Sequence, residues 1–508
     1  MKSMSSSVKD SARSAVGSIK SGAGSLWTYL KSASRATIAS DLKDTWLLWR
    51  TVFRVYIKAG IAVLQRGPRI ILDLKQYPWL LQIADLRSFF RAVRGRKGNY
   101  RKALLMVLED VASVSVQYLV DVLSNPDRVI YFQSAALGLT ELCRAMDLIP
   151  FMDLAPPVVS VLINPRSMEK YMDIAESEGI PSDACSLFRS SQALLFSGQA
   201  PKAAAIVGND MCEGQVNASL LYTKMTGLPT FTFTAPNNFN SERAEEWGEQ
   251  EVMRLVEWLE ENTPGRMDWD RLREIFEEKN RAIEAEMELW EMMRLQPAPL
   301  AAEAIWFSHL ICAAMMGGTK EATKMFETLA ELAKENMEKG VGACPDERYR
   351  AVIWHMPMGA HWHIYRYLEL KWGVSVIQDS MAYNELGFVD TSSKESMLRD
   401  VEIQIMHTPM AIIARGPGEY YLDPLFRVIK HWDINLVLVG DHIGCKSTSA
   451  MVGMLRDRCR KEGIPLIDVP YDLMDTRFAS WEEVRNAFDQ FMETIMNAEP
   501  LREKIPAV

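Results

Sequence analysis

The sequence predicts an α/β protein with two Rossmann-like (flavodoxin-like) parallel-sheet domains, a helical insert and a helical N-terminal extension. Three observations support this fold class. Short apolar runs typical of buried parallel strands fall into two groups along the chain. Helical segments alternate with these runs inside each group. The stretch between the two groups has helical spacing and a high content of charged residues.

Residues 1–80 are predicted to form a basic, partly helical extension. Residues 1–70 contain 12 Lys and Arg but only 3 Asp and Glu, so the rest of the chain carries about −18, which is −9 minus +9. A stronger helix follows Asp44 and should end at Gly67-Pro68. Apolar side chains recur at helical spacing beside a basic stripe: Trp46, Trp49, Phe53 and Ile57, with Arg50, Arg54 and Lys58.

Such a helix is marginal in water by itself and needs a surface on which to pack. We expect residues 44–66 to dock on another subunit. A peripheral contact with a membrane surface and packing on the protein's own acidic body are the alternatives.

Four further segments follow the extension. We predict a helical lead-in at 81–125, a first α/β domain at 126–240, a helical domain at 241–345 and a second α/β domain at 346–508. The first α/β domain should contain a helix at Leu139–Met146. The expected strands are 129–132, 158–163, 203–207 and 230–233 in the first domain, and 351–354, 374–377, 436–439 and 465–469 in the second.

Composition narrows the class of protein. The formal net charge of −9 argues against general nucleic-acid binding. Seven cysteines without a paired pattern indicate a reducing compartment. The sequence has neither an uninterrupted apolar span long enough for a bilayer nor a secretory leader near Met1. We therefore expect a cytoplasmic protein.

Three cysteines are the main candidates for chemistry. Cys212 and Cys445 follow apolar runs that are predicted strands, and Cys185 lies in a separate loop. Residues just past the carboxyl ends of parallel strands line the ligand crevice of open α/β folds. Three thiolates from separate loops can hold three irons of a cubane cluster and leave the fourth iron open.

Other polar residues are weaker candidates. Asp441 and His442 precede Cys445 and could supply a proton or a hydrogen bond to a substrate, or simply form a turn. Arg189 could neutralise a bound cluster, hold a phosphate or form a structural ion pair. Glu141 could face a substrate or lie on a helix surface. His355, His361 and His363 follow a predicted strand and could contribute to a pocket.

Several motifs, taken together and in order, identify a family. The motifs are Glu141-Leu142; Cys185 with Arg189-Ser190-Ser191; Asp210-Met211-Cys212 with Gly227-Leu228-Pro229; Pro297-Ala298-Pro299; and Cys445-Lys446 with Gly463-Ile464-Pro465 and Asp475-Thr476-Arg477. With these motifs, about residues 126–496 resemble the 2-hydroxyacyl-CoA dehydratase and benzoyl-CoA reductase family, and the chain is nearer to its larger, alpha-type subunit. The chain departs from the pattern at Gln133 and Ser134, which occupy a region where several members have a cysteine or serine, and no cysteine stands there.

The resemblance implies a [4Fe–4S] cluster held by Cys185, Cys212 and Cys445, with Glu141, Ser134 and His442 as catalytic candidates. It also implies a heterodimer with a second related cluster-bearing subunit, and an ATP-hydrolysing iron–sulfur activator. The sequence contains no P-loop, so ATP use would belong to that partner.

The implied reaction is the one-electron reduction of an acyl-CoA thioester to a ketyl radical, followed by elimination of water. Two alternatives remain open at this point. The chain could belong to an ATP-dependent benzoyl-CoA reductase, or it could be a non-catalytic paralogue that relays electrons or serves a structural role.

Overall fold

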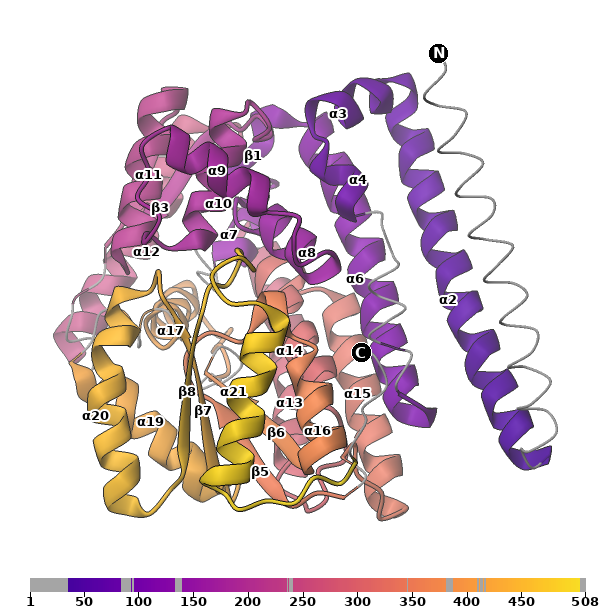
Figure 1. Cartoon of the computed structure of the whole chain (residues 1–508). Helices are drawn as coiled ribbons and strands as arrows, with labels where there is room; N and C mark the ends of the chain where they lie inside the picture. Colours follow the sequence, from indigo (N-terminus) through magenta and orange to yellow (C-terminus); the bar gives the residue numbers. More distant parts are fainter. Residues whose placement is uncertain are drawn as a thin grey trace, which may run out of the picture. The chain divides into compact units, whose positions relative to one another are not determined.

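The computed structural model describes residues 35–83, 93, 96–132, 139–234, 236, 241–344, 346–380, 387–408, 411, 414 and 417–502. Contacts divide the chain into two compact units, residues 1–53 and 54–508. Both sheets belong to the second unit, and Figure 1 labels strands and helices of each. The domain boundaries expected inside this unit remain predictions.

The first sheet has four parallel strands in the order β2-β1-β3-β4. Its strands are β1 (Val129–Phe132), β2 (Ile149–Met152), β3 (Ala205–Asn209) and β4 (Thr230–Phe233). The register pairs Ile130 with Ala205 and Ile206 with Thr230. The connecting helices are α7 (Leu139–Ala145), α8 (Ala155–Ile163), α9 (Glu169–Ser177), α10 (Ser186–Phe196) and α11 (Glu213–Thr226).

The second sheet repeats this topology with the order β6-β5-β7-β8, again all parallel. Its strands are β5 (Tyr349–Ile353), β6 (Val374–Asp379), β7 (Leu436–His442) and β8 (Leu466–Tyr471). The strands before and after this point are added on opposite sides, so the strand order reverses between β1 and β3 and between β5 and β7, which creates a switch point in each sheet. The predicted fold class is therefore confirmed. The helices are η4 (Gly359–His361), α16 (Ile364–Trp372), α17 (Lys394–Met406), α19 (Gly418–His431), α20 (Lys446–Glu462) and α21 (Trp481–Thr494).

A helical region joins the two sheets in sequence. It contains α12 (Glu242–Asn262), α13 (Trp269–Met292), α14 (Ala302–Ile311), the π-helical turn η3 (Cys312–Met316) and α15 (Lys320–Glu338). One hydrophobic core cluster includes β1, α7, α12, α13 and α17, represented by Ile130, Leu142, Val256, Phe276 and Val401. Helix α17 lies between β6 and β7 in sequence, so burial of apolar surface in this core connects that helix with the first sheet.

One predicted strand is wrong. Residues 158–163 lie in helix α8, and the strand beside β1 is Ile149–Met152. Pro156 and Pro157 occupy the first turn of α8, where a proline fits because its missing N–H would have no intrahelical partner. Pro150 is tolerated in β2 because β2 is an edge strand. The apolar run at 158–163 therefore misled the strand prediction.

The extension contains α2 (Arg35–Arg66), η1 (Gly67–Arg69), α3 (Ile70–Gln76) and α4 (Trp79–Ile83). Gly67 has a φ of 64°, and the predicted helix end at Gly67-Pro68 is confirmed. The side chain of Arg54 forms an ion pair with Glu109 of α6 at 2.9 Å. The apolar arc predicted on this helix is exposed at Trp46, Trp49, Phe53 and Ile57.

Helix α6 (Gly98–Ser124) is long and apolar enough to cross a membrane by length and composition alone. Two acidic residues, Glu109 and Asp110, interrupt its apolar sequence near the middle. The helix packs against α14 and α15 within the second unit. About 33 % of its most apolar 18-residue stretch is buried inside the described structure.

Candidate functional site

Three cysteines lie at the N-terminal ends of three helices. Cys185 is the N-cap of α10, Cys212 the N-cap of α11 and Cys445 the N-cap of α20, and all three are free thiols. Cys212 follows β3 and Cys445 follows β7, as the sequence predicts. Cys185 lies between α9 and α10 rather than after a strand. A helix N-terminus carries partial positive charge, which favours a thiolate at each position.

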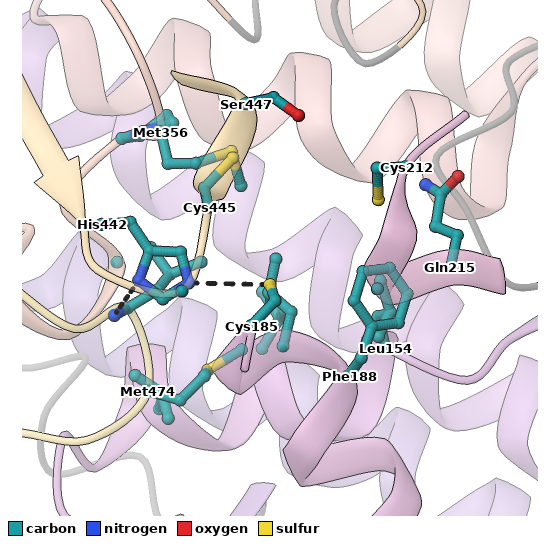
Figure 2. Close-up of a pocket in the computed structure, with 18 of the residues that line it drawn as sticks. Leu154, Cys185, Phe188, Cys212, Gln215, Met356, His442, Cys445, Ser447 and Met474 are labelled. Atoms are coloured by element: carbon teal, nitrogen blue, oxygen red, sulfur yellow. Dashed lines mark hydrogen bonds between the residues drawn. The ribbon is translucent and has the colours of Figure 1, made fainter. Parts of the chain in front are cut away.

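The three thiols line one cavity of about 130 Å³. Figure 2 shows their sulfur atoms on different sides of a common space. The lining comes largely from segments that follow the carboxyl ends of strands: Leu154 after β2, Cys212 after β3, Met356 after β5, Cys445 after β7 and Met474 after β8. This position agrees with the crevice expected at the switch points of parallel sheets.

Two glycines allow the helix ends to approach one another. A Cβ atom on Gly444 would lie 2.6 Å from the Cα atom of Cys185 and 2.9 Å from the carbonyl oxygen of Ala184. A Cβ atom on Gly214 would lie 2.6 Å from the Phe188 ring. Such distances are too short for a real Cβ atom, so both positions require glycine for the observed packing.

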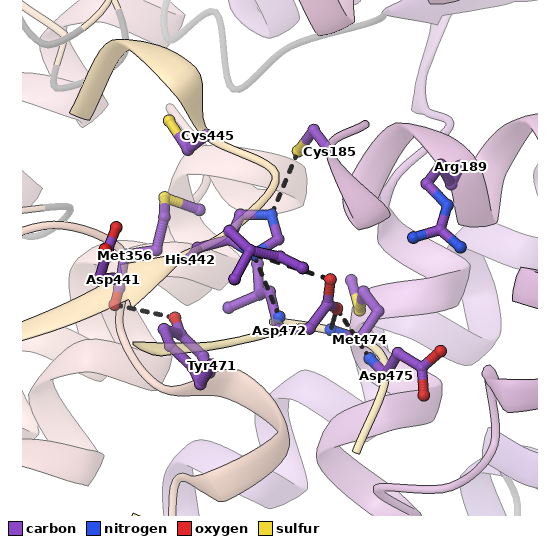
Figure 3. Close-up of polar contacts among 12 residues, drawn as sticks. Cys185, Arg189, Met356, Asp441, His442, Cys445, Tyr471, Asp472, Met474 and Asp475 are labelled. Carbon is purple, nitrogen blue, oxygen red and sulfur yellow. Dashed lines mark hydrogen bonds and ion pairs between the residues drawn. The ribbon is translucent and has the colours of Figure 1, made fainter. Parts of the chain in front are cut away.

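His442 hydrogen-bonds the thiol of Cys185. Its Nε2 atom lies 3.6 Å from the Cys185 Sγ atom, and its Nδ1 atom accepts a hydrogen bond from the backbone N–H of Leu473 at 3.3 Å (Figure 3). Burial lowers the pKa of His442, which favours the neutral ring. Because Nδ1 is an acceptor, the proton of the neutral ring is on Nε2 and points toward the sulfur.

Asp472 lies on the Nδ1 side of the same ring. Its Oδ2 atom is 4.0 Å from Nδ1 of His442. Its Oδ1 atom accepts the backbone N–H groups of Met474 at 2.8 Å and Asp475 at 2.9 Å. These bonds fix the loop after β8 beneath the histidine.

Burial dominates the protonation of the three thiols. It raises the pKa of Cys185 well above its ordinary value, an effect strengthened by Cys212 and Cys445. It raises the pKa of Cys212 to about 12 and also raises that of Cys445. Backbone N–H groups of each following helical turn oppose these shifts. The thiols are therefore neutral until a cation replaces their protons.

The donor set fits a cluster better than one metal ion. Within the part of the chain that the structure describes, no three His, Cys, Asp or Glu groups lie close enough together to hold a single ion. The ligands of one zinc ion all lie about 2.0–2.3 Å from it. Ligands of an iron–sulfur cluster bind different irons, so their sulfurs surround a larger volume. Cys185, Cys212 and Cys445 surround a common cavity in this way.

The loop that carries Cys185 is held from two sides. Arg189 donates a hydrogen bond to the carbonyl oxygen of Ser182 at 2.6 Å and forms an ion pair with Glu176. Lys446 binds Asp183 with 3.0 Å between Nζ and Oδ2. The structural interpretation of Arg189 therefore accounts for its contacts.

His355 and Asp441 each contact the first turn of α20, the helix that Cys445 caps. The buried ring of His355 contacts the hydroxyl of Thr448, whose Oγ1 also lies 3.3 Å from the carbonyl oxygen of Cys445. Asp441 accepts a hydrogen bond from Ser449 at 2.6 Å. Both contacts tie α20 to the strand ends. His361 hydrogen-bonds the carbonyl oxygen of Ala479 at 3.0 Å and does not line the cavity.

Glu141 does not line the cavity around the three cysteines. Its buried carboxylate pairs with Lys279 at 2.9 Å and accepts a hydrogen bond from Thr140 at 2.8 Å. Burial tends to raise the pKa of Glu141, but Lys279 outweighs this effect and the pKa is lowered. Ser134 lies outside the described residues.

The sequence interpretation missed Gln215. This residue lines the cavity from the first turn of α11, three positions after Cys212, and its side chain is 1 % exposed. Its Oε1 atom has no hydrogen-bond partner within the described structure. The spacing in the sequence could have indicated Gln215, because a residue three positions after an N-cap cysteine lies in the first turn of the same helix.

The fold and site define a protein with two flavodoxin-like sheets and three cysteine thiols around one cavity at their carboxyl ends. Residues 139–495 match the family described as 2-hydroxyglutaryl-CoA dehydratase, D-component. The match covers more than half of the 508 residues, so the chain belongs to this family. No curated protein matches the sequence. The family resemblance inferred from the motifs is confirmed, and the chain is a dehydratase-type component.

Proposed function

We propose that this chain is the subunit of a 2-hydroxyacyl-CoA dehydratase, a hydro-lyase, that holds a [4Fe–4S] cluster on Cys185, Cys212 and Cys445. The observation that carries the proposal is the convergence of three helix N-termini, each with a cysteine at its cap, on one cavity. A cluster with three protein ligands would supply an electron and an open iron as a Lewis acid.

The residues of this chain have three roles in the proposal. The cysteines hold the cluster, and the Nε2–H group of His442 hydrogen-bonds the sulfur of Cys185. Apolar side chains exclude water from the reacting thioester. The overall reaction removes water from a 2-hydroxyacyl-CoA to give an enoyl-CoA, and the electron that forms the ketyl radical of the thioester is recovered at the end.

The D-component family implies a partner component. We propose that this component is a second related cluster-bearing subunit and that an ATP-hydrolysing iron–sulfur activator delivers the electron. We propose a cytoplasmic location, since the sequence indicates a reducing compartment. In the alternative, a benzoyl-CoA reductase, the substrate has no hydroxyl group that could hydrogen-bond Gln215.

The test is the iron and sulfide content of anaerobically purified protein, with an electron paramagnetic resonance spectrum. Replacing Cys185, Cys212 or Cys445 by alanine should remove the cluster signal and most of the iron. Cys459→Ala is the matched control, because Cys459 is buried in α20 and does not line the cavity. Full iron in any of the three ligand variants would show that this cysteine is not a ligand.

A further inference from the structure

The cavity wall is apolar on nearly every side. Helices α8, α10 and α14 contribute aliphatic and aromatic side chains, and the loops after β5 and β8 contribute methionine, proline and leucine. These residues include Val158, Val161, Leu162, Leu187, Phe188, Trp306, Leu310, Met356, Pro357, Leu473 and Met474. A ligand group gains free energy here by burying apolar surface.

Few side chains of the described lining could stabilise a negative charge. Its one permanently charged cation is Lys446, which is half exposed and paired with Asp183. His442 also lines the cavity, and its Nε2 atom contacts the thiol of Cys185. Glu213, also in the lining, would repel an anion. A buried carboxylate without a partner is strongly disfavoured.

Gln215 supplies a polar contact in this apolar surface. Its side chain is 1 % exposed and its Oε1 atom has no partner within the described structure. Figure 2 shows the side chain beside Cys212. An amide oxygen only accepts hydrogen bonds, so the group that satisfies it must be a donor. The hydroxyl of a 2-hydroxyacyl group is such a donor, whereas an unsubstituted acyl chain offers none.

We propose that the apolar wall of the cavity, beside the cluster on the cysteines, takes a 2-hydroxyacyl thioester whose acyl chain is apolar and uncharged, and that Gln215 accepts the hydrogen bond of the 2-hydroxyl group. The inference rests on the proposed function and narrows it. It separates this chain from a protein that takes a glutaryl group, whose second carboxylate would need a cation that the described wall does not provide.

The test compares three probes by isothermal titration calorimetry on the full chain under anaerobic conditions: 2-hydroxyhexanoyl-CoA, 2-hydroxyglutaryl-CoA and hexanoyl-CoA. The first should bind more than about tenfold more tightly than the second, because the carboxylate is buried unpaired. It should bind about fivefold more tightly than the third, which corresponds to one hydrogen bond of about 1 kcal/mol.

Two variants test the assignment of residues. Gln215→Leu should bind 2-hydroxyhexanoyl-CoA and hexanoyl-CoA equally and still discriminate against 2-hydroxyglutaryl-CoA. Asn217→Leu, on the exposed side of the same helix, is the control and should keep both preferences. Val158→Lys places a cation in the wall and should raise the affinity for 2-hydroxyglutaryl-CoA relative to 2-hydroxyhexanoyl-CoA.

Each contrary result has its own meaning. Tighter binding of 2-hydroxyglutaryl-CoA by the unmodified chain overturns the apolar acyl group while the proposed function stands. A preserved preference for the hydroxyl group in Gln215→Leu overturns the role of Gln215. Failure of all three thioesters to bind overturns the proposed function and this inference with it.

Discussion

Replacing Gly444 by alanine should separate the loop before α20 from Cys185. The added Cβ atom would lie 2.6 Å from Cys185 Cα, 2.9 Å from the Ala184 oxygen and 2.9 Å from Nε2 of His442. Two of these three atoms belong to the backbone, so a change of side-chain rotamer cannot relieve the contact. The loop must move by several tenths of an ångström or more, and it carries Cys445 with it.

The expected cost of this overpacking is about 1–3 kcal/mol. The control is Gly453→Ala in the interior of α20, where a Cβ atom would meet nothing within 4 Å. An alanine in a helix interior is more favourable than glycine by about 0.5–1 kcal/mol. The two substitutions in one segment should therefore change stability in opposite directions.

The assay is the midpoint of thermal unfolding together with the iron content after anaerobic purification. Gly444→Ala should unfold at a lower temperature and retain less iron, because the distance between the Cys185 and Cys445 sulfurs changes. Gly453→Ala should unfold at the same or a higher temperature and keep its iron. If both variants match in midpoint and iron, the close approach at Gly444 is not a determinant of the site.

Three further predictions follow from the structure. His442→Phe removes the hydrogen bond to Cys185 and should lower the reduction potential of the reconstituted cluster, measured by redox titration; an unchanged potential would contradict the bond. Burial, together with the nearby Glu245, raises the pKa of Glu402 from 4.5 to about 8, so the folded state favours the protonated carboxyl group. The stability that Glu402 contributes is therefore complete below pH 4.5 and is lost as the pH rises through 8. Glu402→Gln should therefore stabilise the protein at pH 8 by up to about 4 kcal/mol and have little effect at pH 5 in denaturant unfolding, whereas an equal effect at both pH values would refute the shift. Deletion of residues 1–80 should leave the iron content intact and abolish assembly with the partner subunit in size-exclusion chromatography; normal assembly with loss of liposome binding alone would favour the membrane alternative instead.

Part of the site could be predicted from sequence because topology determines it. Cys212 and Cys445 follow apolar runs, and parallel strands place their carboxyl ends at one edge of a sheet. Cys185 has no strand before it, so only the family motif selects it from the seven cysteines. The contact between Cys185 and His442 joins residues 257 positions apart, and no local pattern reports such a distance.

Other errors also have physical causes. Residues 158–163 have the β-branched composition of a strand, but Pro156-Pro157 begins a helix and tertiary packing completes it. Glu141 belongs to a recognisable motif, but its carboxylate pairs with Lys279 from α13, 138 positions later. The need for glycine at 214 and 444 arises from the approach of separate helices, and so it is visible only in three dimensions.

The helix ends and the apolar cavity have opposite effects on the thiols. The helix N-terminus at Cys212 favours its thiolate by up to about 2 kcal/mol. Burial nevertheless raises its pKa from 9.0 to about 12, which makes ionisation about 4 kcal/mol less favourable than for a thiol in water. The helix dipole therefore cannot keep Cys212 ionised by itself. Cys212 is therefore a neutral thiol until a metal replaces its proton, and the thiolate forms at that step. The helix N-termini then act on the bound group, since their N–H groups already point toward the sulfur atoms that would carry its negative charge.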